Sequence, residues 1–220
     1  MPYTKLVHPS TILVSGPTGC GKTQFVANLI KYNMFSPMPE KIVWCYGEDQ
    51  SLYRELALLR PEIDFVNGIP PDLYDSLDAN ILNLVIFDDQ MSKTRDSTDI
   101  SRFFTEGSHH RNLSIIYIVQ NLFDKGKSHR TVSLNAQYMV LFKNPRDRAQ
   151  VGALAKQMFP GKCNSFYLLS SFMDATSVPY GYLLLDLRQE TPEEFRLRTS
   201  ILPNESCFVY APSKYANQKV

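Results

Sequence analysis

The sequence predicts an α/β fold, with helices covering a mostly parallel sheet and an antiparallel hairpin following it. Short apolar runs alternate with amphipathic stretches, which is typical of parallel strands connected by helices. Hydrophobic residues make up 44% of the 220 residues and charged residues 20%, as in a globular domain with one core. We therefore expect a single domain over residues 1–220, with a core at about 11–160 and a hairpin and tail at about 161–220.

The apolar runs define the expected elements in order. A first strand over Thr11–Ser15 precedes a helix over Lys22–Tyr32, whose buried stripe contains Phe25, Val26, Leu29 and Ile30. Further strands are expected at Lys41–Tyr46, Asp64–Val66, Leu84–Asp88, Ser114–Val119 and Tyr138–Phe142. Helices are expected at Asp99–Glu106 and Asp147–Phe159, and the hairpin at Tyr180–Asp186 and Phe195–Ser200. In such folds ligands bind where the parallel strands end.

Composition excludes several classes of protein. The four cysteines, Cys20, Cys45, Cys163 and Cys207, are scattered and form no zinc-binding or disulfide pattern. The first residues do not resemble a signal peptide, and no segment is long and apolar enough to span a bilayer. We expect an intracellular protein that is neither secreted nor inserted in a membrane. The net charge of +1 implies that any basic surface is local.

A phosphate-binding motif lies between the first strand and the first helix. It consists of Gly16, Pro17, Thr18, Gly19, Cys20, Gly21, Lys22 and Thr23, and matches G-x-x-x-x-G-K-[S/T]. Its N–H groups and the start of the helix would bind the phosphates of ATP. Lys22 would contact the β- and γ-phosphates, and Thr23 would ligate Mg²⁺. A glycine-rich turn without a ligand is the alternative, but a chance match is roughly a one per cent event. The motif predicts a P-loop NTPase of the RecA/ASCE-like type.

Two carboxylates follow the apolar run 84–87. We expect this run to lie in the middle of the sheet, next to the first strand. Asp88 would hold Mg²⁺ through its water shell, and Asp89 would orient and deprotonate the attacking water. Aspartate is shorter than the glutamate usual at the second position, which allows Asp89 to act through a second water. An acidic turn that caps the next helix is the alternative.

The strand over residues 114–119 has a functional candidate at each end. Gln120, which follows it, would lie beside the γ-phosphate, unless it only bonds its own loop. Arg111 precedes it and would lie roughly 20 Å away, since each strand residue spans about 3.3 Å. Arg111 could then reach only a neighbour's ATP, as an arginine finger within a ring. A plain surface arginine is the alternative.

A basic loop follows the same strand. Lys125, Lys127 and Arg130 surround a glycine, which suits contact with DNA phosphates without sequence readout. A solvated run of charge is an equally good interpretation. Arg146 and Arg148 follow the strand over 138–142, and the sequence leaves open whether Arg146 senses phosphate or contacts DNA.

Taken together, several segments resemble a known family. These are residues 16–23, 84–89, FFTEGSHHRNLSIIYIVQNLF (103–123), SLNAQYMVLFKNPRD (133–147) and YGYLLLDL (180–187). They resemble the genome-packaging ATPases of Polinton (Maverick) elements and adintoviruses, small members of the FtsK–HerA superfamily. The resemblance covers about residues 11–203 and supports the roles given to Lys22, Thr23, Asp88, Asp89, Gln120 and Arg111.

The resemblance implies an ATP-hydrolysing translocase that packages double-stranded viral DNA into a preformed capsid. Such a motor would form a homo-oligomeric ring and meet a capsid or portal vertex. It would act in the nucleus or cytoplasm of the infected host, or associate with the virion. The superfamily commonly has glutamate where Asp89 stands, so Asp89 departs from the pattern, although packaging relatives tolerate aspartate there.

Two other functions fit the same loop. A small-molecule P-loop kinase would need an acceptor pocket and an arginine-rich lid, and the sequence contains no convincing lid. A nucleotide-gated capsid scaffold would bind ATP without pumping DNA. Turnover stimulated by DNA would distinguish the motor from both alternatives.

Overall fold

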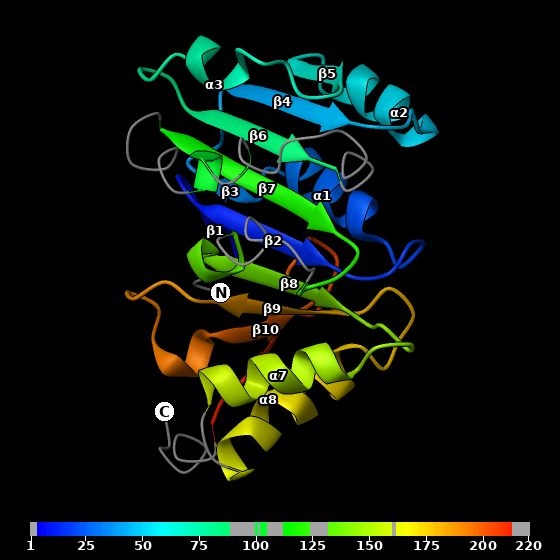
Figure 1. Ribbon diagram of the computed structural model, residues 1–220, viewed down its shortest axis with the longest axis vertical. Helices are drawn as coiled ribbons and strands as arrows, with labels where there is room; N and C mark the ends of the chain where they lie inside the picture. Colours follow the sequence, from blue (N-terminus) through cyan, green and yellow to red (C-terminus); the bar gives the residue numbers. More distant parts are fainter. Residues whose placement is uncertain are drawn as a thin grey trace.

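The computed structural model describes residues 4–88, 100, 102–104, 112–123, 132–159 and 162–212. Within these residues a nine-stranded sheet has the order β11-β10-β9-β8-β2-β7-β6-β4-β5 (Figure 1). Its strands are β2 (Thr11–Ser15), β4 (Lys41–Tyr46), β5 (Ile63–Asn67), β6 (Asn83–Phe87), β7 (Leu113–Val119), β8 (Tyr138–Phe142), β9 (Tyr182–Asp186), β10 (Leu197–Thr199) and β11 (Phe208–Tyr210). In this order, neighbouring strands from β8 to β5 pair in parallel. Strands β9, β10 and β11 extend the sheet beyond β8, and each pairs antiparallel with the strand before it. The predicted fold class is confirmed.

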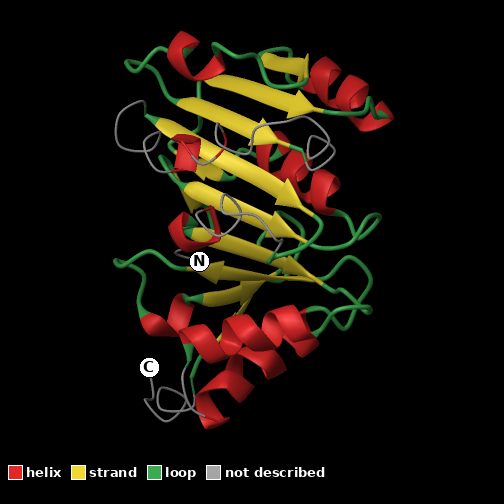
Figure 2. Cartoon of the chain, viewed as in Figure 1, coloured by secondary structure: helices red, strands yellow, loops and turns green. Residues whose placement is uncertain are grey.

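Helices cover both faces of this sheet. They are α1 (Lys22–Lys31), α2 (Ser51–Leu59), α3 (Leu73–Ser76), α7 (Ala149–Met158) and α8 (Lys162–Ala175). Figure 2 shows α1 behind the sheet and the pair α7 and α8 in front of its lower part. Over the described residues, no helix combines the length and the apolar character that crossing a membrane requires.

Two apolar cores lie on the two faces of the sheet. Ile12 and Val14 of β2 pack in the core that contains α1, whereas Leu13 packs in the core that contains α7 and α8. Successive side chains of a strand point to opposite faces, so one continuous apolar run serves both cores. This explains why β2, β6, β7 and β8 are buried along their whole length.

Most predicted elements are present, with small shifts at their ends. The predicted hairpin is confirmed, since Leu197 of β10 pairs with Leu185 of β9 in an antiparallel register. A 3₁₀ turn, η3 (Glu193–Phe195), precedes β10 and shortens that strand. Of the helix expected at Asp99–Glu106, residues 100 and 102–104 are helical and the others lie outside the described residues. The sequence did not predict α2, α3, α8 and β11, nor the small parallel pair β1 (Leu6–Val7) and β3 (Phe35–Ser36).

The expected position of the carboxylate strand was wrong by one strand. Strand β7 lies between β2 and β6 and pairs in parallel with both. All seven residues of β7 are buried, as expected of a strand that is paired on both sides and covered on both faces. Gln120, which follows β7, is therefore the nearer neighbour of the loop after β2. Asp88, which follows β6, is one strand further away, and adjacent strands are about 4.8 Å apart.

Candidate functional site

The loop after β2 adopts a conformation that depends on its glycines. Gly19 and Gly21 have φ angles of +79° and +101°, in the left-handed region that favours glycine. Gly21 is also the N-cap residue of α1. A Cβ atom at Gly16 would lie 2.6 Å from Cβ of Phe142, so β8 leaves no room for a side chain there. Each of these three glycines therefore meets a requirement of the backbone that another residue would not meet without strain or a clash.

Lys22 is the buried cation of this loop. Its side chain is 8% exposed, and its Nζ donates hydrogen bonds to the carbonyl oxygens of Gly16 at 2.6 Å and Pro17 at 3.0 Å. Among the described residues it has no carboxylate partner. Neutral carbonyls satisfy its donors without cancelling its charge, so the ammonium group keeps the capacity to bind an anion.

Asp88 is held beside the loop by two hydroxyl groups. Tyr53 of α2 donates to Oδ2 of Asp88 at 2.8 Å, and Thr23 of α1 donates to the same oxygen at 3.4 Å. Asp88 is 3% exposed, and its backbone N–H donates to the carbonyl oxygen of Cys45 at 3.0 Å. Burial and the negative charge of Asp88 raise the pKa of Tyr53 above its usual value. Tyr53 therefore remains a protonated donor that fixes the orientation of the carboxylate.

Thr23 and Asp88 fit the donor chemistry of magnesium. Mg²⁺ prefers hard oxygen ligands and keeps several of its own waters, so one or two protein oxygens suffice. The Thr23 hydroxyl and the Asp88 carboxylate are such oxygens, on neighbouring elements at one edge of the sheet. These two residues could hold the ion, and their separate roles, direct for Thr23 and through water for Asp88, stay predictions.

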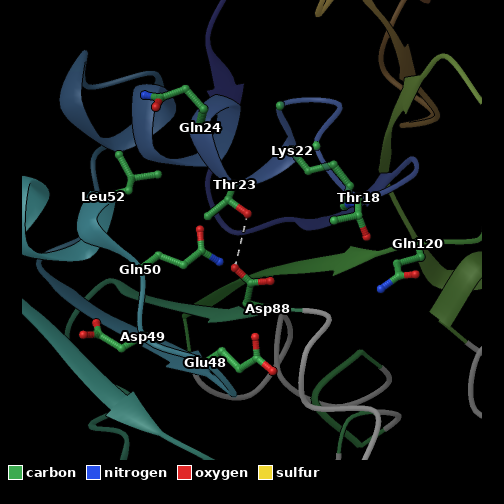
Figure 3. A pocket seen from close by; sticks show the side chains of 12 residues that line it. Thr18, Lys22, Thr23, Gln24, Glu48, Asp49, Gln50, Leu52, Asp88 and Gln120 are labelled. Atoms are coloured by element: carbon green, nitrogen blue, oxygen red, sulfur yellow. Dashed lines mark hydrogen bonds between the residues drawn. The ribbon is translucent and has the colours of Figure 1, made fainter.

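These side chains surround one cavity of about 490 Å³. Figure 3 shows Lys22, Thr23, Asp88 and Gln120 around it. Its lining consists of Thr18, Gly19, Gly21, Lys22, Thr23, Gln24, Glu48, Asp49, Gln50, Leu52, Asp88 and Gln120. The structure thus joins the predicted phosphate, metal and sensor residues in a single pocket.

Four residues of this region were not predicted to be functional. Glu48, Asp49 and Gln50 follow β4 and line the cavity, and Tyr53 reaches Asp88 from the next helix. Asp49 forms an ion pair with Arg54, whereas Glu48 extends toward the cavity near Asp88 (Figure 3). For the three residues after β4 the sequence contains a usable signal. Strand β4 is parallel to β6, so the residues that follow β4 must lie at the same edge of the sheet as Asp88.

Several predicted residues cannot be placed. Asp89, Arg111, Lys125, Lys127 and Arg130 lie outside the described residues, so their roles stay predictions.

Three other residues considered in the sequence are described. Arg146 and Arg148 are exposed and do not line the 490 Å³ cavity. Burial raises the pKa of the Cys20 thiol above its usual value, although the charge of Lys22 acts in the opposite direction. Cys20 is therefore a weak nucleophile in this loop.

Solved structures of a viral NTPase are similar to this chain. Two are B204, the genome packaging NTPase of Sulfolobus turreted icosahedral virus 2, in complex with ATPγS (TM-score 0.53, 10% identity) and with AMPPCP (TM-score 0.55, 11% identity). A third is B204, the DNA-packaging ATPase from Sulfolobus turreted icosahedral virus (TM-score 0.54, 12% identity). Each comparison covers 92% of this chain and 97% of the other.

At this level of identity the similarity shows a shared fold over nearly the whole length of both chains. No protein-family model matches the sequence, and no curated protein matches it significantly.

Proposed function

We propose that the protein is a magnesium-dependent ATPase that drives double-stranded DNA into a preformed viral capsid. The observation that carries the ATPase assignment is the single cavity at which Lys22, Thr23 and Asp88 meet. The packaging role rests on the resemblance to Polinton and adintovirus ATPases of the FtsK–HerA superfamily. The fold shared with B204 agrees with it.

The residues of the loop and of the neighbouring strands would divide the work of hydrolysis. The loop N–H groups and Lys22 bind the β- and γ-phosphates, while Thr23 and Asp88 hold Mg²⁺ beside them. When bound, Mg²⁺ neutralises part of the charge on the phosphate oxygens. Gln120 lies at the cavity where the γ-phosphate would be and reports its presence.

Asp89 completes the reaction in this proposal. It orients a water molecule and accepts its proton as the water oxygen bonds to the γ-phosphorus. The bond between that phosphorus and the β–γ bridging oxygen breaks, giving ADP and phosphate. Asp89→Asn would then bind ATP without hydrolysing it, and unchanged turnover would exclude Asp89 as the base.

The motor assignment adds an assembly and a polymer. Subunits would form a homo-oligomeric ring in which Arg111 of one chain serves the ATP of the next. Lys125, Lys127 and Arg130 would contact the DNA backbone, and the ring would meet a capsid or portal vertex of a virus in its host cell, or remain with the virion. The role in trans requires that Arg111 and Gln120 be far apart within one chain. In support of this, Leu113, which follows Arg111 closely in sequence, and Gln120 lie at opposite ends of β7.

ATP turnover with and without duplex DNA, measured together with the mass in solution, tests this proposal. We expect duplex DNA to stimulate phosphate release from an oligomer. Replacing Lys125, Lys127 and Arg130 together with alanine should remove the stimulation but keep the basal rate. A kinase would be indifferent to DNA, and a scaffold would show slow turnover that neither DNA nor assembly changes.

The role in trans has its own test. Arg111→Ala subunits keep their phosphate loops, and Lys22→Ala subunits keep their arginines. Mixed rings would therefore contain some interfaces with both groups and recover part of the activity. Mixtures as inactive as their components would exclude Arg111 as a finger.

A further inference from the structure

A second cavity adjoins the first on the other side of the phosphate loop. It has a volume of about 400 Å³, and Gly21 and Gln24 line both cavities. Asp88 and Gln120 line only the first, so the terminal phosphate of a nucleotide belongs there. The ribose and base of that nucleotide must then extend away from the terminal phosphate. The two cavities meet at Gly21 and Gln24, so the base can reach the second cavity there.

The floor of the second cavity is aromatic and rigid. The ring centroids of Phe25 and Tyr182 are 4.6 Å apart, and those of Phe142 and Tyr182 are 5.8 Å apart. All three side chains are buried, with exposed fractions of 3 to 4%. The cavity therefore has an apolar, aromatic base that is already part of the core, in contrast to the first cavity, which is lined by charged side chains.

Tyr180 forms a wall of the second cavity and is unusually exposed for an aromatic residue. It is 72% exposed, and its ring lies over the phosphate loop, 3.2 Å from the position of a Cβ atom at Gly21. Its backbone has φ +62°, and a Cβ atom on the next residue, Gly181, would lie 2.4 Å from the carbonyl oxygen of Ala175. The chain is thus tightly constrained where it presents a free aromatic face beside the loop.

Glu205 supplies a polar group at the same cavity. Its Oε2 accepts hydrogen bonds from the Tyr182 hydroxyl at 3.0 Å and from the Leu202 N–H at 3.1 Å. The Tyr182 oxygen in turn accepts from the N–H of Ile201 at 2.8 Å, which fixes the phenol. A carboxylate has about four acceptor positions, so the anchored group can still accept a hydrogen bond from a ligand.

We propose that this second cavity binds the adenine base of ATP, stacked on Tyr180 with its amino group donating to Glu205. Adenine matches the site because it is flat, apolar on its faces and carries N–H donors on its edge. The inference rests on the proposed function, since it requires the phosphates to occupy the loop.

Calorimetry with two ligands separates the base from the phosphates. Mg·ATP and magnesium tripolyphosphate, which has no base, are titrated into the full-length protein and into Tyr180→Ala. We expect Tyr180→Ala to bind ATP about tenfold more weakly, the usual cost of losing one base–aromatic stack. Its affinity for tripolyphosphate should not change. Tyr180→Phe should bind ATP as the wild type does, because the ring is retained.

The matched control is Phe166→Ala on α8, which removes another exposed aromatic ring, 64% exposed, that does not line the cavity. It should leave both affinities unchanged. Unchanged ATP affinity in Tyr180→Ala, or an equal loss for both ligands, would overturn the proposal. Failure of the wild type to bind either ligand would instead overturn the proposed nucleotide site itself.

A second titration tests the contact with Glu205. The triphosphate of purine riboside lacks the amino group of adenine, so the wild type should bind it about tenfold more weakly than ATP. In Glu205→Ala the two nucleotides should bind equally, which isolates the pair as a double-mutant cycle does. Equal affinities in the wild type would overturn the amino group contact.

Discussion

Opposite edges of the same sheet bury charge in different ways. At the carboxyl edge of the parallel strands, Lys22 is held by the carbonyl oxygens of its own loop. At the other edge, where the antiparallel strand β9 ends, Asp186 binds two arginines. Nη2 of Arg198 donates to Asp186 at 2.9 Å, and Arg188 donates to both of its carboxylate oxygens at 3.1 and 3.0 Å.

The difference separates a site from a structural element. Asp186 and Arg198 are 0 and 1% exposed, and they neutralise each other within the protein. Burial alone would raise the pKa of Asp186, but the hydrogen bond from Arg188 and the charges of Arg198 and Arg188 lower it overall. The carboxylate of this cluster is thus matched by cations of the protein itself. The phosphate loop holds a cation that no carboxylate of the described residues matches, so it is completed by an anion.

The sharpest test of this contrast is Lys22→Ala. The variant should lose ATP turnover by at least about 100-fold, because the charge aimed at the phosphates is gone. Its free energy of unfolding should fall by only about 1 kcal/mol, since the hydrogen bonds that are lost go to two neutral carbonyl oxygens of the same loop. Phosphate release and denaturant unfolding measure the two effects. Lys31→Ala, at the exposed end of the same helix, is the control, and near-normal turnover in Lys22→Ala would refute the assignment.

Asp186→Asn should show the reverse pattern. Removing the charge leaves buried arginine uncompensated, which costs about 3 kcal/mol of stability. The ATP affinity of the folded protein should not change, because the cluster lies at the far edge of the sheet. Glu193→Gln breaks the exposed pair with Arg196 and should cost less than about 0.5 kcal/mol. If Asp186→Asn instead lost nucleotide binding at unchanged stability, the two edges would not be independent.

Tyr53→Phe probes how the orientation of Asp88 affects the metal. The ring keeps its packing against Trp44 and Phe65, at 5.4 and 5.3 Å, but the hydrogen bond to Asp88 is lost. The Mg²⁺ concentration for half-maximal turnover should rise about fivefold, the usual worth of one hydrogen bond. Tyr46→Phe, in the same aromatic cluster, should have no such effect. An equal rise in both variants would show that the hydroxyl of Tyr53 has no specific role.

The smallest expected effect is the pH dependence of the Asp186 cluster. Because the pKa of Asp186 is lowered on folding, its contribution to stability is complete above the usual value of 3.8. It is lost as the pH falls through the lower pKa of the folded protein. The stability difference between the wild type and Asp186→Asn should therefore be constant near pH 6 and smaller near pH 3. Denaturant unfolding at both values measures it, and a difference that grew in acid would contradict the sign.

The sequence predicted best what depends on neighbouring residues. The phosphate loop is one continuous pattern, and Asp88 ends an apolar run, so both could be recognised directly. The order of β2, β7 and β6 could not, because it depends on which strands the connections bring together. Helix α8 was missed since Phe166 and Met173 are exposed while Leu168 and Phe172 are buried, which blurs its helical period.

The site was predicted only in part for a related reason. Tyr53 is 35 residues from Asp88 in sequence, and their contact exists only because α2 follows the strand that pairs with β6. Tyr180 likewise reaches Gly21 from a loop far along the chain. Long-range contacts of this kind leave no local pattern to read.

The central strand β7 also has a mechanical consequence. It has two paired neighbours and seven buried residues, so it cannot slide or bend without breaking two ladders and both cores. Seven residues at about 3.3 Å each form a stiff rod of roughly 20 Å. A displacement of the Gln120 end would therefore move the Leu113 end as well. If the protein changes shape, the change is therefore expected in the segments attached to the two ends of β7 rather than within the strand.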